Sequence, residues 1–221
     1  MNHQLIDLVL QTKVIAIVRG LDGGMEPLVQ ALYDGGVRAV EVTFNQKQEA
    51  PYRTTTQAIR AIRACMGEKM AVGAGTVVTE QQAELAFEAG AQFMVSPDTN
   101  PDVIRRAKAL GLVTMPGALT PSEILTAHEA GADFVKIFPA GVLGAGYIKA
   151  ICAPLNHIRL LAVGGVNEKN AAEFLKAGCV GVGVGGNLVN REWIAQGQYE
   201  KITQAARALC CAVHEDGGQI K

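Results

Sequence analysis

Three charged residues interrupt segments that are otherwise apolar and rich in β-branched side chains. Lys136 lies within FVKIF (134–138), Glu41 lies within AVEVTF (39–44), and Arg19 ends AIVR (16–19). A charge that is buried alone in a strand is costly, so each of these side chains must be paired, neutralised or placed at an opening of the fold. A Lys–Glu pair that braces the fold is one interpretation, and a reactive pair is the other.

The reactive interpretation follows from the chemistry of a desolvated lysine. At an unperturbed pKa, only about one lysine in 2,500 is neutral at pH 7. Burial and a cationic neighbour lower that pKa, and a value near 7 would raise the nucleophilic fraction about a thousandfold. A neutral lysine attacks a ketone and forms an iminium ion, and a nearby carboxylate can then move protons at the adjacent carbon. Lys136 and Glu41 therefore indicate Schiff-base chemistry, with Arg19 able to lower the lysine pKa and to bind a substrate carboxylate.

Two glycine pairs suggest where an anion would bind. Gly164-Gly165 follows LLAV, and Gly185-Gly186-Asn187 follows VGV near the end of the chain. Each pair comes between a predicted strand and a helical turn, where backbone N–H groups commonly bind phosphate in barrel enzymes. Tight turns alone would also explain the glycines, but pairs on two consecutive strands favour a phosphate site.

The elements that must position these residues recur along the chain at intervals of roughly 20–30 residues. Eight short apolar segments begin at Lys13, Ala39, Met70, Phe93, Leu112, Phe134, Arg159 and Cys179. Helical patterns separate them, with N-caps predicted at Thr79, Asn100 and Thr120 and left-handed glycine caps at Gly36, Gly90, Gly111, Gly131 and Gly178.

This repeat predicts a single (β/α)₈ TIM barrel over residues 1–221, with the tail after Val213 frayed. The near-continuous apolar character of the segments is typical of parallel strands that helices cover. An open doubly wound sheet is the competing architecture, but the segment after the first strand, IVRGLDGG, lacks its G-x-G-x-x-G fingerprint. Arg19, Thr43, Thr76 and Lys136 all fall toward the carboxyl ends of their strands, where barrel enzymes carry their active sites.

Composition excludes several classes of partner. The 221 residues carry a net charge of −1, which argues against nucleic-acid binding, and no run of eighteen apolar residues predicts a membrane span. No secretory signal is apparent, and five cysteines without Cys-x-x-Cys spacing suggest a reduced cytoplasmic protein. Four scattered histidines with no carboxylate–His spacing argue against a metal site, and no cofactor is expected.

Six motifs occur in order along the chain: Glu41-Val42-Thr43-Phe44-Asn45, Gly73-Ala74-Gly75-Thr76-Val77, Ser96-Pro97, Met115-Pro116-Gly117, Phe134-Val135-Lys136-Ile137-Phe138-Pro139-Ala140 and Val163-Gly164-Gly165-Val166. With these motifs the chain resembles the 2-keto-3-deoxy-6-phosphogluconate (KDPG) / 4-hydroxy-2-oxoglutarate (KHG) aldolase family. The resemblance covers almost the whole chain, and the lysine segment is its most specific part. It implies a class I pyruvate aldolase, a lyase on a (β/α)₈ barrel and usually a homotrimer, that cleaves a 2-keto acid to pyruvate and an aldehyde.

The resemblance also implies roles for individual residues. Lys136 matches the Schiff-base lysine, Glu41 matches the general acid/base, and Thr76 matches a contact to the pyruvyl carboxylate. Further substrate contacts are expected from Arg19, Thr43, Asn45, Pro116, Gly117 and Phe138, and phosphate contacts from Gly164, Gly165, Gly185, Gly186 and Asn187. Two positions depart from the family pattern, because Asn45 stands where an arginine is common and Asn187 where a serine is common.

The expected reaction is cleavage of a KDPG-type 2-keto-3-deoxy-6-phospho acid to pyruvate and glyceraldehyde 3-phosphate, with cleavage of 4-hydroxy-2-oxoglutarate to pyruvate and glyoxylate as a related activity. The alternative is the branch that acts on 2-keto-3-deoxy-6-phosphogalactonate, which FPAGVLGAGYIKA (138–150), Arg19 and Asn45 also resemble. Two readings from other classes stay open: a phosphate-binding barrel isomerase or epimerase without a covalent intermediate, and a non-catalytic sugar-phosphate sensor.

Overall fold

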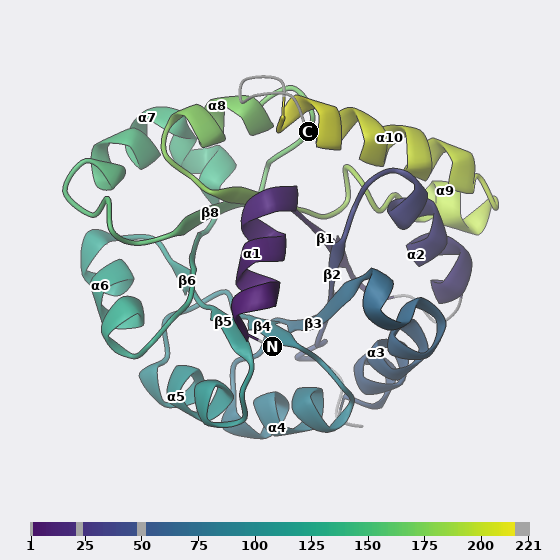
Figure 1. Ribbon diagram of the computed structural model, residues 1–221, viewed down its shortest axis with the longest axis horizontal. Coiled ribbons are helices and arrows are strands. Elements are labelled where there is room, and N and C mark those ends of the chain that lie inside the picture. The colour runs from purple at the N-terminus through teal and green to yellow at the C-terminus, as the bar shows by residue number, and fades with distance from the viewer. Residues whose placement is uncertain (1, 21–23, 48–51, 215–221) are drawn as a thin grey trace.

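The computed structural model describes residues 2–20, 24–47 and 52–214, and within them the chain forms a parallel β-barrel (Figure 1). Its strands are β1 (Val14–Val18), β2 (Ala39–Thr43), β3 (Ala71–Gly75), β4 (Phe93–Val95), β5 (Val113–Met115), β6 (Gly117–Ala118), β7 (Val135–Ile137), β8 (Leu160–Val163) and β9 (Gly181–Val184). They are ordered β5-β4-β3-β2-β1-β9-β8-β7-β6, and every pair is parallel.

Strands β5 and β6 are two halves of the fifth barrel strand, divided at Pro116. The first half pairs with β4 and the second pairs with β7. The break follows from the ring of proline, which has no N–H to give to the sheet. The Pro116 carbonyl still accepts a hydrogen bond from the Lys136 N–H at 2.8 Å, so the two edges of the sheet meet. The eight-stranded barrel predicted from the sequence is confirmed.

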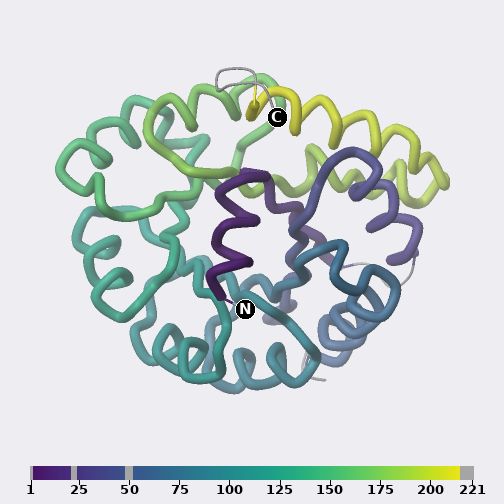
Figure 2. The backbone as a smooth tube through the Cα atoms, in the orientation of Figure 1, coloured from purple at the N-terminus to yellow at the C-terminus, as the bar shows by residue number. Residues whose placement is uncertain are grey.

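Helices surround the barrel and complete each β/α unit (Figures 1 and 2). They are α1 (Asn2–Thr12), α2 (Met25–Asp34), α3 (Arg53–Met66), α4 (Glu80–Glu88), α5 (Pro101–Ala109), α6 (Pro121–Glu129), α7 (Ala140–Cys152), α8 (Ala171–Lys176), α9 (Arg191–Ala195) and α10 (Tyr199–Ala212), with a 3-10 turn, η1 (Gly67–Lys69). The last helix lies against α2 and closes the ring, and Thr203 Oγ1 donates to the Ala31 carbonyl at 3.0 Å.

The predicted helix boundaries are confirmed at both ends. Thr79, Asn100 and Thr120 accept backbone N–H bonds as N-caps, and Thr120 forms a full capping box with Glu123. The five glycines predicted to follow helices have φ values between 84° and 117°, a left-handed conformation in which a Cβ would be strained.

Side-chain alternation divides the hydrophobic residues into two clusters. Even-numbered residues of β1 and β2, such as Ala16 and Val40, face the helices. Odd-numbered residues, such as Ile15 and Ala39, face the barrel interior together with Phe93 and other large side chains. Because alternate residues of a strand point to the same face, this register also fixes the direction of the residues that end each strand.

Helix α1 closes the amino-terminal end of the barrel, which the sequence analysis did not anticipate. It lies across the centre of the ring in Figure 1, and Leu5, Ile6 and Val9 join the interior cluster. One end of the barrel is therefore filled with apolar side chains, which leaves the carboxyl ends of the strands as the open end.

No helix among the described residues is long and apolar enough to span a bilayer. The prediction of a frayed tail concerns residues 215–221, which lie outside the described part of the chain. His214, the residue before them, has its ring nitrogens at 2.7 Å from the Cys210 carbonyl and 3.0 Å from the Gln11 carbonyl.

Candidate active site

Lys136 and Glu41 lie inside the barrel near its open end. Lys136 follows the inward-facing Phe134 by two positions, and Glu41 follows the inward-facing Ala39 by two, so both side chains face inward. Only 5% of Lys136 and 3% of Glu41 is exposed. Within the described residues neither headgroup has a hydrogen bond or an ion pair, so their charges are not balanced by a direct protein contact.

Glycine makes the space that Glu41 occupies. Gly75 ends β3 beside β2, and a Cβ at this position would lie 2.7 Å from Glu41 Oε1 and 2.9 Å from Thr43 Cγ2. The carboxylate therefore lies directly over the backbone of β3. Gly73, in the same Gly-Ala-Gly-Thr motif, is required by packing in mid-barrel, because a Cβ there would lie 2.3 Å from the Phe93 ring. Gly75, by contrast, borders the site.

Burial lowers the pKa of Lys136, and this is the largest influence on it. The charge of Glu41 acts against the shift, Arg19 adds to it, and Asp98 opposes it. The Lys136 ammonium also lies 4.8 Å from the centroid of the Phe138 ring. A lysine that is held by apolar and aromatic neighbours with its pKa lowered is a more available nucleophile at neutral pH than a surface lysine.

Burial raises the pKa of Glu41, and the positive charges of Lys136 and Arg19 oppose that rise. A carboxyl group whose pKa is raised toward neutrality can both accept and return a proton during one reaction cycle. The two buried groups therefore have pKa values that move toward each other, which is the arrangement that a nucleophilic amine and a general acid/base require.

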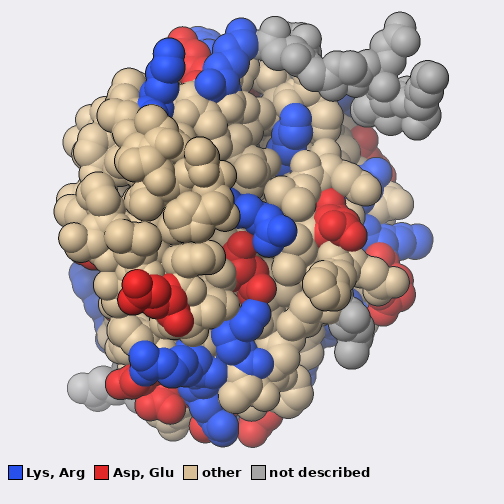
Figure 3. All heavy atoms as spheres, turned by 60° about the vertical axis from the view of Figure 1, so that its left-hand side comes forward, with Lys and Arg blue, Asp and Glu red and all other residues tan. Residues whose placement is uncertain are grey.

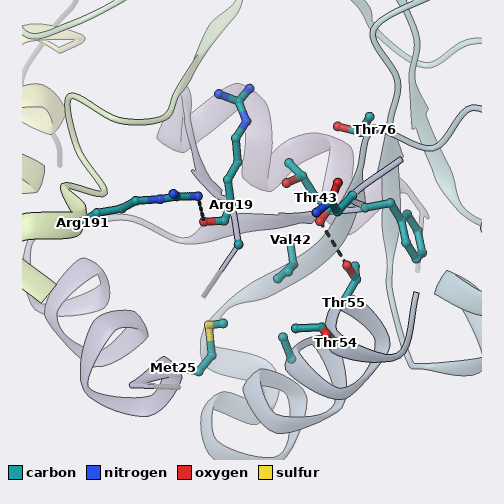
Figure 4. Close-up of a pocket in the computed structure, with 12 residues that line it drawn as sticks. Arg19, Met25, Val42, Thr43, Thr54, Thr55, Thr76 and Arg191 are labelled. Atoms are coloured by element: carbon teal, nitrogen blue, oxygen red, sulfur yellow. Dashed lines mark hydrogen bonds between the residues drawn. The ribbon is translucent and has the colours of Figure 1, made fainter. Parts of the chain in front are cut away.

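Thr76 has an unusual backbone conformation directly after β3. Its φ is +56°, in the left-handed region, which is a rare position for a β-branched residue and costs on the order of 1–3 kcal/mol. The Thr76 side chain borders a cavity of about 320 Å³ together with Arg19, Thr43 and Asn45 (Figure 4). The structure thus brings together four of the predicted substrate residues at the carboxyl ends of the strands, in a cavity whose lining does not include Lys136 or Glu41.

Two of these rim residues also hold the loops in place. Thr43 Oγ1 donates to the Val18 carbonyl at 3.4 Å, and the Thr43 carbonyl accepts from Thr55 Oγ1 at 3.1 Å (Figure 4). Asn45 is exposed, and its Oδ1 accepts from the Lys47 N–H at 3.0 Å. The Asn45 amide keeps its N–H groups for a ligand, but it carries no charge where an arginine would.

Pro116 and Gly117 form the wall beside Lys136. Gly117 pairs with Lys136 across β6 and β7, and both Pro116 and Gly117 are buried. A Cβ on Gly117 would lie 2.4 Å from the Pro97 carbonyl oxygen, so only glycine allows the Ser96-Pro97 loop to approach. The predicted Ser96-Pro97 and Met115-Pro116-Gly117 motifs are therefore one packed unit.

The glycine pairs meet where the sequence predicted an anion site. A cavity of about 140 Å³ is lined by the predicted residues Gly164, Gly165, Gly185, Gly186 and Asn187, and by Arg19. Gly164 and Gly165 have φ values of +89° and +77°. Asn187 Nδ2 donates to the Val166 carbonyl at 3.2 Å, so this amide joins the two glycine loops to each other.

The structure adds two charged residues that the motifs did not indicate. Arg191, at the first turn of α9, borders the rim cavity with Arg19, and its Nη2 donates to the Arg19 carbonyl at 3.2 Å (Figure 4). Asp98 acts electrostatically on Lys136, and its own pKa is raised by burial. Asp98 does not cap α5, whose N-cap is Asn100. Arg191 could not be found from spacing, because it lies far from Arg19 in sequence.

In the described part of the chain, no three His, Cys, Asp or Glu side chains are grouped so that they could hold a metal ion.

Comparison with known proteins agrees with the motifs and the site geometry. The model of the KDPG and KHG aldolase family matches residues 6–205. The chain belongs to this family. A 2-dehydro-3-deoxy-6-phosphogalactonate aldolase of Escherichia coli (strain K12) is 40% identical over 210 residues, covering 93% of this chain and 97% of that protein. The family's members are lyases of the class I aldolase type, and so is this chain.

Two solved structures share the fold of this aldolase. A native KDPGal structure superimposes with a TM-score of 0.81 at 39% identity, covering 91% of this chain and 94% of that one. A KDPG aldolase from Legionella pneumophila, with pyruvate captured at low pH as a covalent carbinolamine intermediate, superimposes with a TM-score of 0.82 at 26% identity. That match covers 92% of this chain and 97% of the other.

Proposed function

We propose that Lys136 is the Schiff-base lysine of this aldolase and that Glu41 is its general acid/base. The observation that carries the proposal is the pair itself: an amine and a carboxylate, both more than nine-tenths buried, at the open end of the barrel. The carbinolamine trapped in the Legionella pneumophila relative supports covalent capture of pyruvate in this family.

In the cleavage direction, neutral Lys136 attacks the C2 carbonyl of the keto acid, and loss of water gives the iminium ion. Glu41 accepts the proton of the C4 hydroxyl, directly or through a water, while the C3–C4 bond breaks and its electron pair moves into the iminium. The aldehyde leaves, and the remaining enamine takes a proton at C3 from Glu41. Water then hydrolyses the iminium, which releases pyruvate and restores Lys136.

The rim residues fit the carboxylate of the keto acid. Thr76, Thr43 and Arg19 border one cavity at the carboxyl ends of the strands, where the Thr76 hydroxyl can donate a hydrogen bond and Arg19 can pair with the carboxylate. The small cavity between the two glycine loops fits the phosphate at the other end of the substrate, because glycine loops at the ends of barrel strands commonly present backbone N–H groups to phosphate.

The preferred substrate is 2-keto-3-deoxy-6-phosphogalactonate, which the sequence analysis held as the alternative to the phosphogluconate epimer. The 40% identical relative bears the name of the galactonate enzyme, and Arg19 with Asn45 resembles that branch. The two substrates differ in configuration at C4, whose hydroxyl Glu41 must reach, so the preference is expected in kcat/KM.

Steady-state kinetics on the two phosphorylated C4 epimers and on 4-hydroxy-2-oxoglutarate test this assignment. A kcat/KM at least about tenfold higher for the galactonate epimer is expected, which corresponds to about 1.4 kcal/mol of transition-state preference. An equal or higher kcat/KM for the gluconate epimer or for 4-hydroxy-2-oxoglutarate would contradict the assignment.

An oligomer, with a homotrimer expected from the family resemblance, is the proposed state in solution. Leu119, Leu125 and Val142 are exposed apolar side chains on or beside α6 and α7, and Val142 is 82% exposed. Figure 3 shows a broad uncharged surface on this side of the barrel. One related solved structure is a protein cage designed by fusing symmetric oligomeric domains, which supports a symmetric assembly. Light scattering of the parent and of Val142→Lys checks this, with dissociation expected in the variant.

A reducing compartment such as the cytoplasm is consistent with the cysteines. All five, Cys65, Cys152, Cys179, Cys210 and Cys211, are free thiols in the structure. Burial raises the pKa of Cys210 to about 11, so this thiol is a poor nucleophile at neutral pH.

A further inference from the structure

A chain of two glutamine side chains ends on the backbone of Thr76. Gln82, on α4, is completely buried, and its Oε1 accepts from the Val78 N–H at 2.7 Å. Gln82 Nε2 donates to Gln46 Oε1 at 2.9 Å, and Gln46 Nε2 donates to the Thr76 carbonyl at 2.9 Å. The three bonds connect the loop after β2 with the loop between β3 and α4.

The orientation of both amides is set by the backbone groups at the two ends of this chain. A backbone N–H can only donate and a carbonyl can only accept, so Gln82 must turn its oxygen toward Val78 and Gln46 must turn its nitrogen toward Thr76. Reversal of either amide would place two acceptors or two donors face to face. The three hydrogen bonds therefore form with only one orientation of each amide, and through them the buried Gln82 fixes the position of Gln46 against the Thr76 carbonyl.

Helix capping accounts for only part of this arrangement. Gln82 is the third residue of α4, a place where a glutamine commonly accepts a backbone N–H near the helix start, and Thr79 is the N-cap. The cap does not explain why Nε2 of a completely buried glutamine is directed to a residue of another β/α unit. Nor does it explain why an exposed glutamine directly after Asn45 reaches across to a strained threonine.

Thr76 is the residue whose position these hydrogen bonds affect, and its side chain borders the cavity at the rim. Its neighbours are held by backbone bonds, since Phe44 N–H donates to the Gly75 carbonyl at 2.8 Å and Val77 N–H donates to the Val95 carbonyl at 3.1 Å. Thr76 lies between them at φ +56°, and its carbonyl is held by Gln46. A strained residue keeps its conformation only when its surroundings fix it.

We propose that Gln46 and Gln82 are positioning residues that hold Thr76 so that its hydroxyl meets the carboxylate of the bound keto acid. The proposal rests on the proposed function, in which Thr76 contacts that carboxylate. Gln46 and Gln82 touch no substrate themselves, so their loss should weaken keto-acid binding and leave the reactivity of Lys136 unaltered.

The test uses three variants and measures capture of pyruvate by borohydride together with steady-state kinetics. Gln82→Met keeps the length of the side chain but has no donor for Gln46 and no acceptor for the Val78 N–H. Gln46→Ala removes the link at an exposed position where folding should be preserved, and the double variant combines both. Gln92→Met is the matched control, because Gln92 Oε1 also accepts a backbone N–H, that of Val72, and accepts from Arg63, at the opposite end of the barrel.

Each single variant should raise the pyruvate concentration for half-maximal labelling and the KM by about three- to tenfold, as expected for one misplaced hydrogen bond, with kcat within about twofold. The low-pH limb of kcat/KM should not move. The double variant should equal Gln46→Ala, because Gln82 acts through Gln46. The control should label like the parent.

Three results would overturn the proposal: unchanged half-saturation in Gln46→Ala, additive effects in the double variant, or a loss of kcat that follows the loss of thermal stability. Failure of the parent itself to be labelled would instead refute the proposed function. A labelled parent with unaffected variants would refute only the positioning role of Gln46 and Gln82.

Discussion

Gly75→Ala is the substitution that tests the position of Glu41 without changing Glu41. The added Cβ would lie 2.7 Å from Glu41 Oε1, about 0.7 Å inside the lower limit of ordinary contact near 3.4 Å. The Glu41 carboxylate is the end of a flexible side chain, whereas Thr43 Cγ2, 2.9 Å from the added Cβ, belongs to a β-branched side chain that is stiff. The carboxylate should therefore take most of the displacement and move by roughly half an ångström while the barrel remains folded. The change is therefore expressed in catalysis more than in stability.

A displacement of this size should lower kcat/KM by about 10- to 100-fold, since a misplacement of about 1 Å can cost about 10²-fold in rate. Capture of pyruvate on Lys136 should persist, because Gly75 has no contact with the lysine. Steady-state kinetics, borohydride labelling and thermal melting measured on one preparation separate these effects.

Gly146→Ala is the matched control. Gly146 lies within α7 and has no atom within 4 Å of an added Cβ, so this change should leave kcat/KM unaltered and stabilise the helix by up to about 1 kcal/mol. A Gly75→Ala enzyme with kcat/KM within about twofold of the parent would refute the placement of Glu41 at the reacting carbon. Loss of pyruvate labelling in that variant would show that the alanine disturbs more than the carboxylate.

Three further predictions address the charge, the phosphate end and the opposite end of the barrel. Arg19→Gln removes a positive charge that lowers the pKa values of both Lys136 and Glu41, so the low-pH limb of kcat/KM should move to higher pH. A raised KM with an unmoved limb would show that Arg19 only binds substrate. Asn187→Ala removes the hydrogen bond that joins the two glycine loops and should raise KM for the phosphorylated substrate about three- to tenfold. Labelling by pyruvate, which has no phosphate, should be unaffected and serves as the control. Asp133→Ala, at the amino-terminal end of β7, loses bonds from Thr114 and should lower the free energy of unfolding by about 1–3 kcal/mol in a denaturant titration while kcat stays constant.

The barrel was predictable because its signals are local and repeated. An apolar run, a helix and a glycine with φ near +90° are each encoded within a few neighbouring residues, as Gly90 and Gly131 show. The inward direction of Lys136 and Glu41 was also predictable, because alternation along a strand fixes it. Helix α1 was missed because its role is tertiary: its apolar face becomes meaningful only when a barrel end exists to receive Leu5, Ile6 and Val9.

The contacts that refine the site were not predictable from spacing. Arg191 meets the carbonyl of Arg19, and Gln46 meets that of Thr76, only after the chain has closed the barrel. The reason for Gly75 is likewise a contact with a carboxylate on the neighbouring strand. The motifs did not decide between the phosphogluconate and phosphogalactonate epimers, and the 40% identical relative bears the name of the galactonate enzyme.

The most direct test of the account is reduction of the enzyme with borohydride in the presence of pyruvate, followed by peptide mass analysis. One added carboxyethyl group per chain is expected, located on Lys136, and none in Lys136→Ala. An unlabelled parent enzyme that still releases pyruvate from its substrate, or a label on another lysine, would contradict the assignment of Lys136.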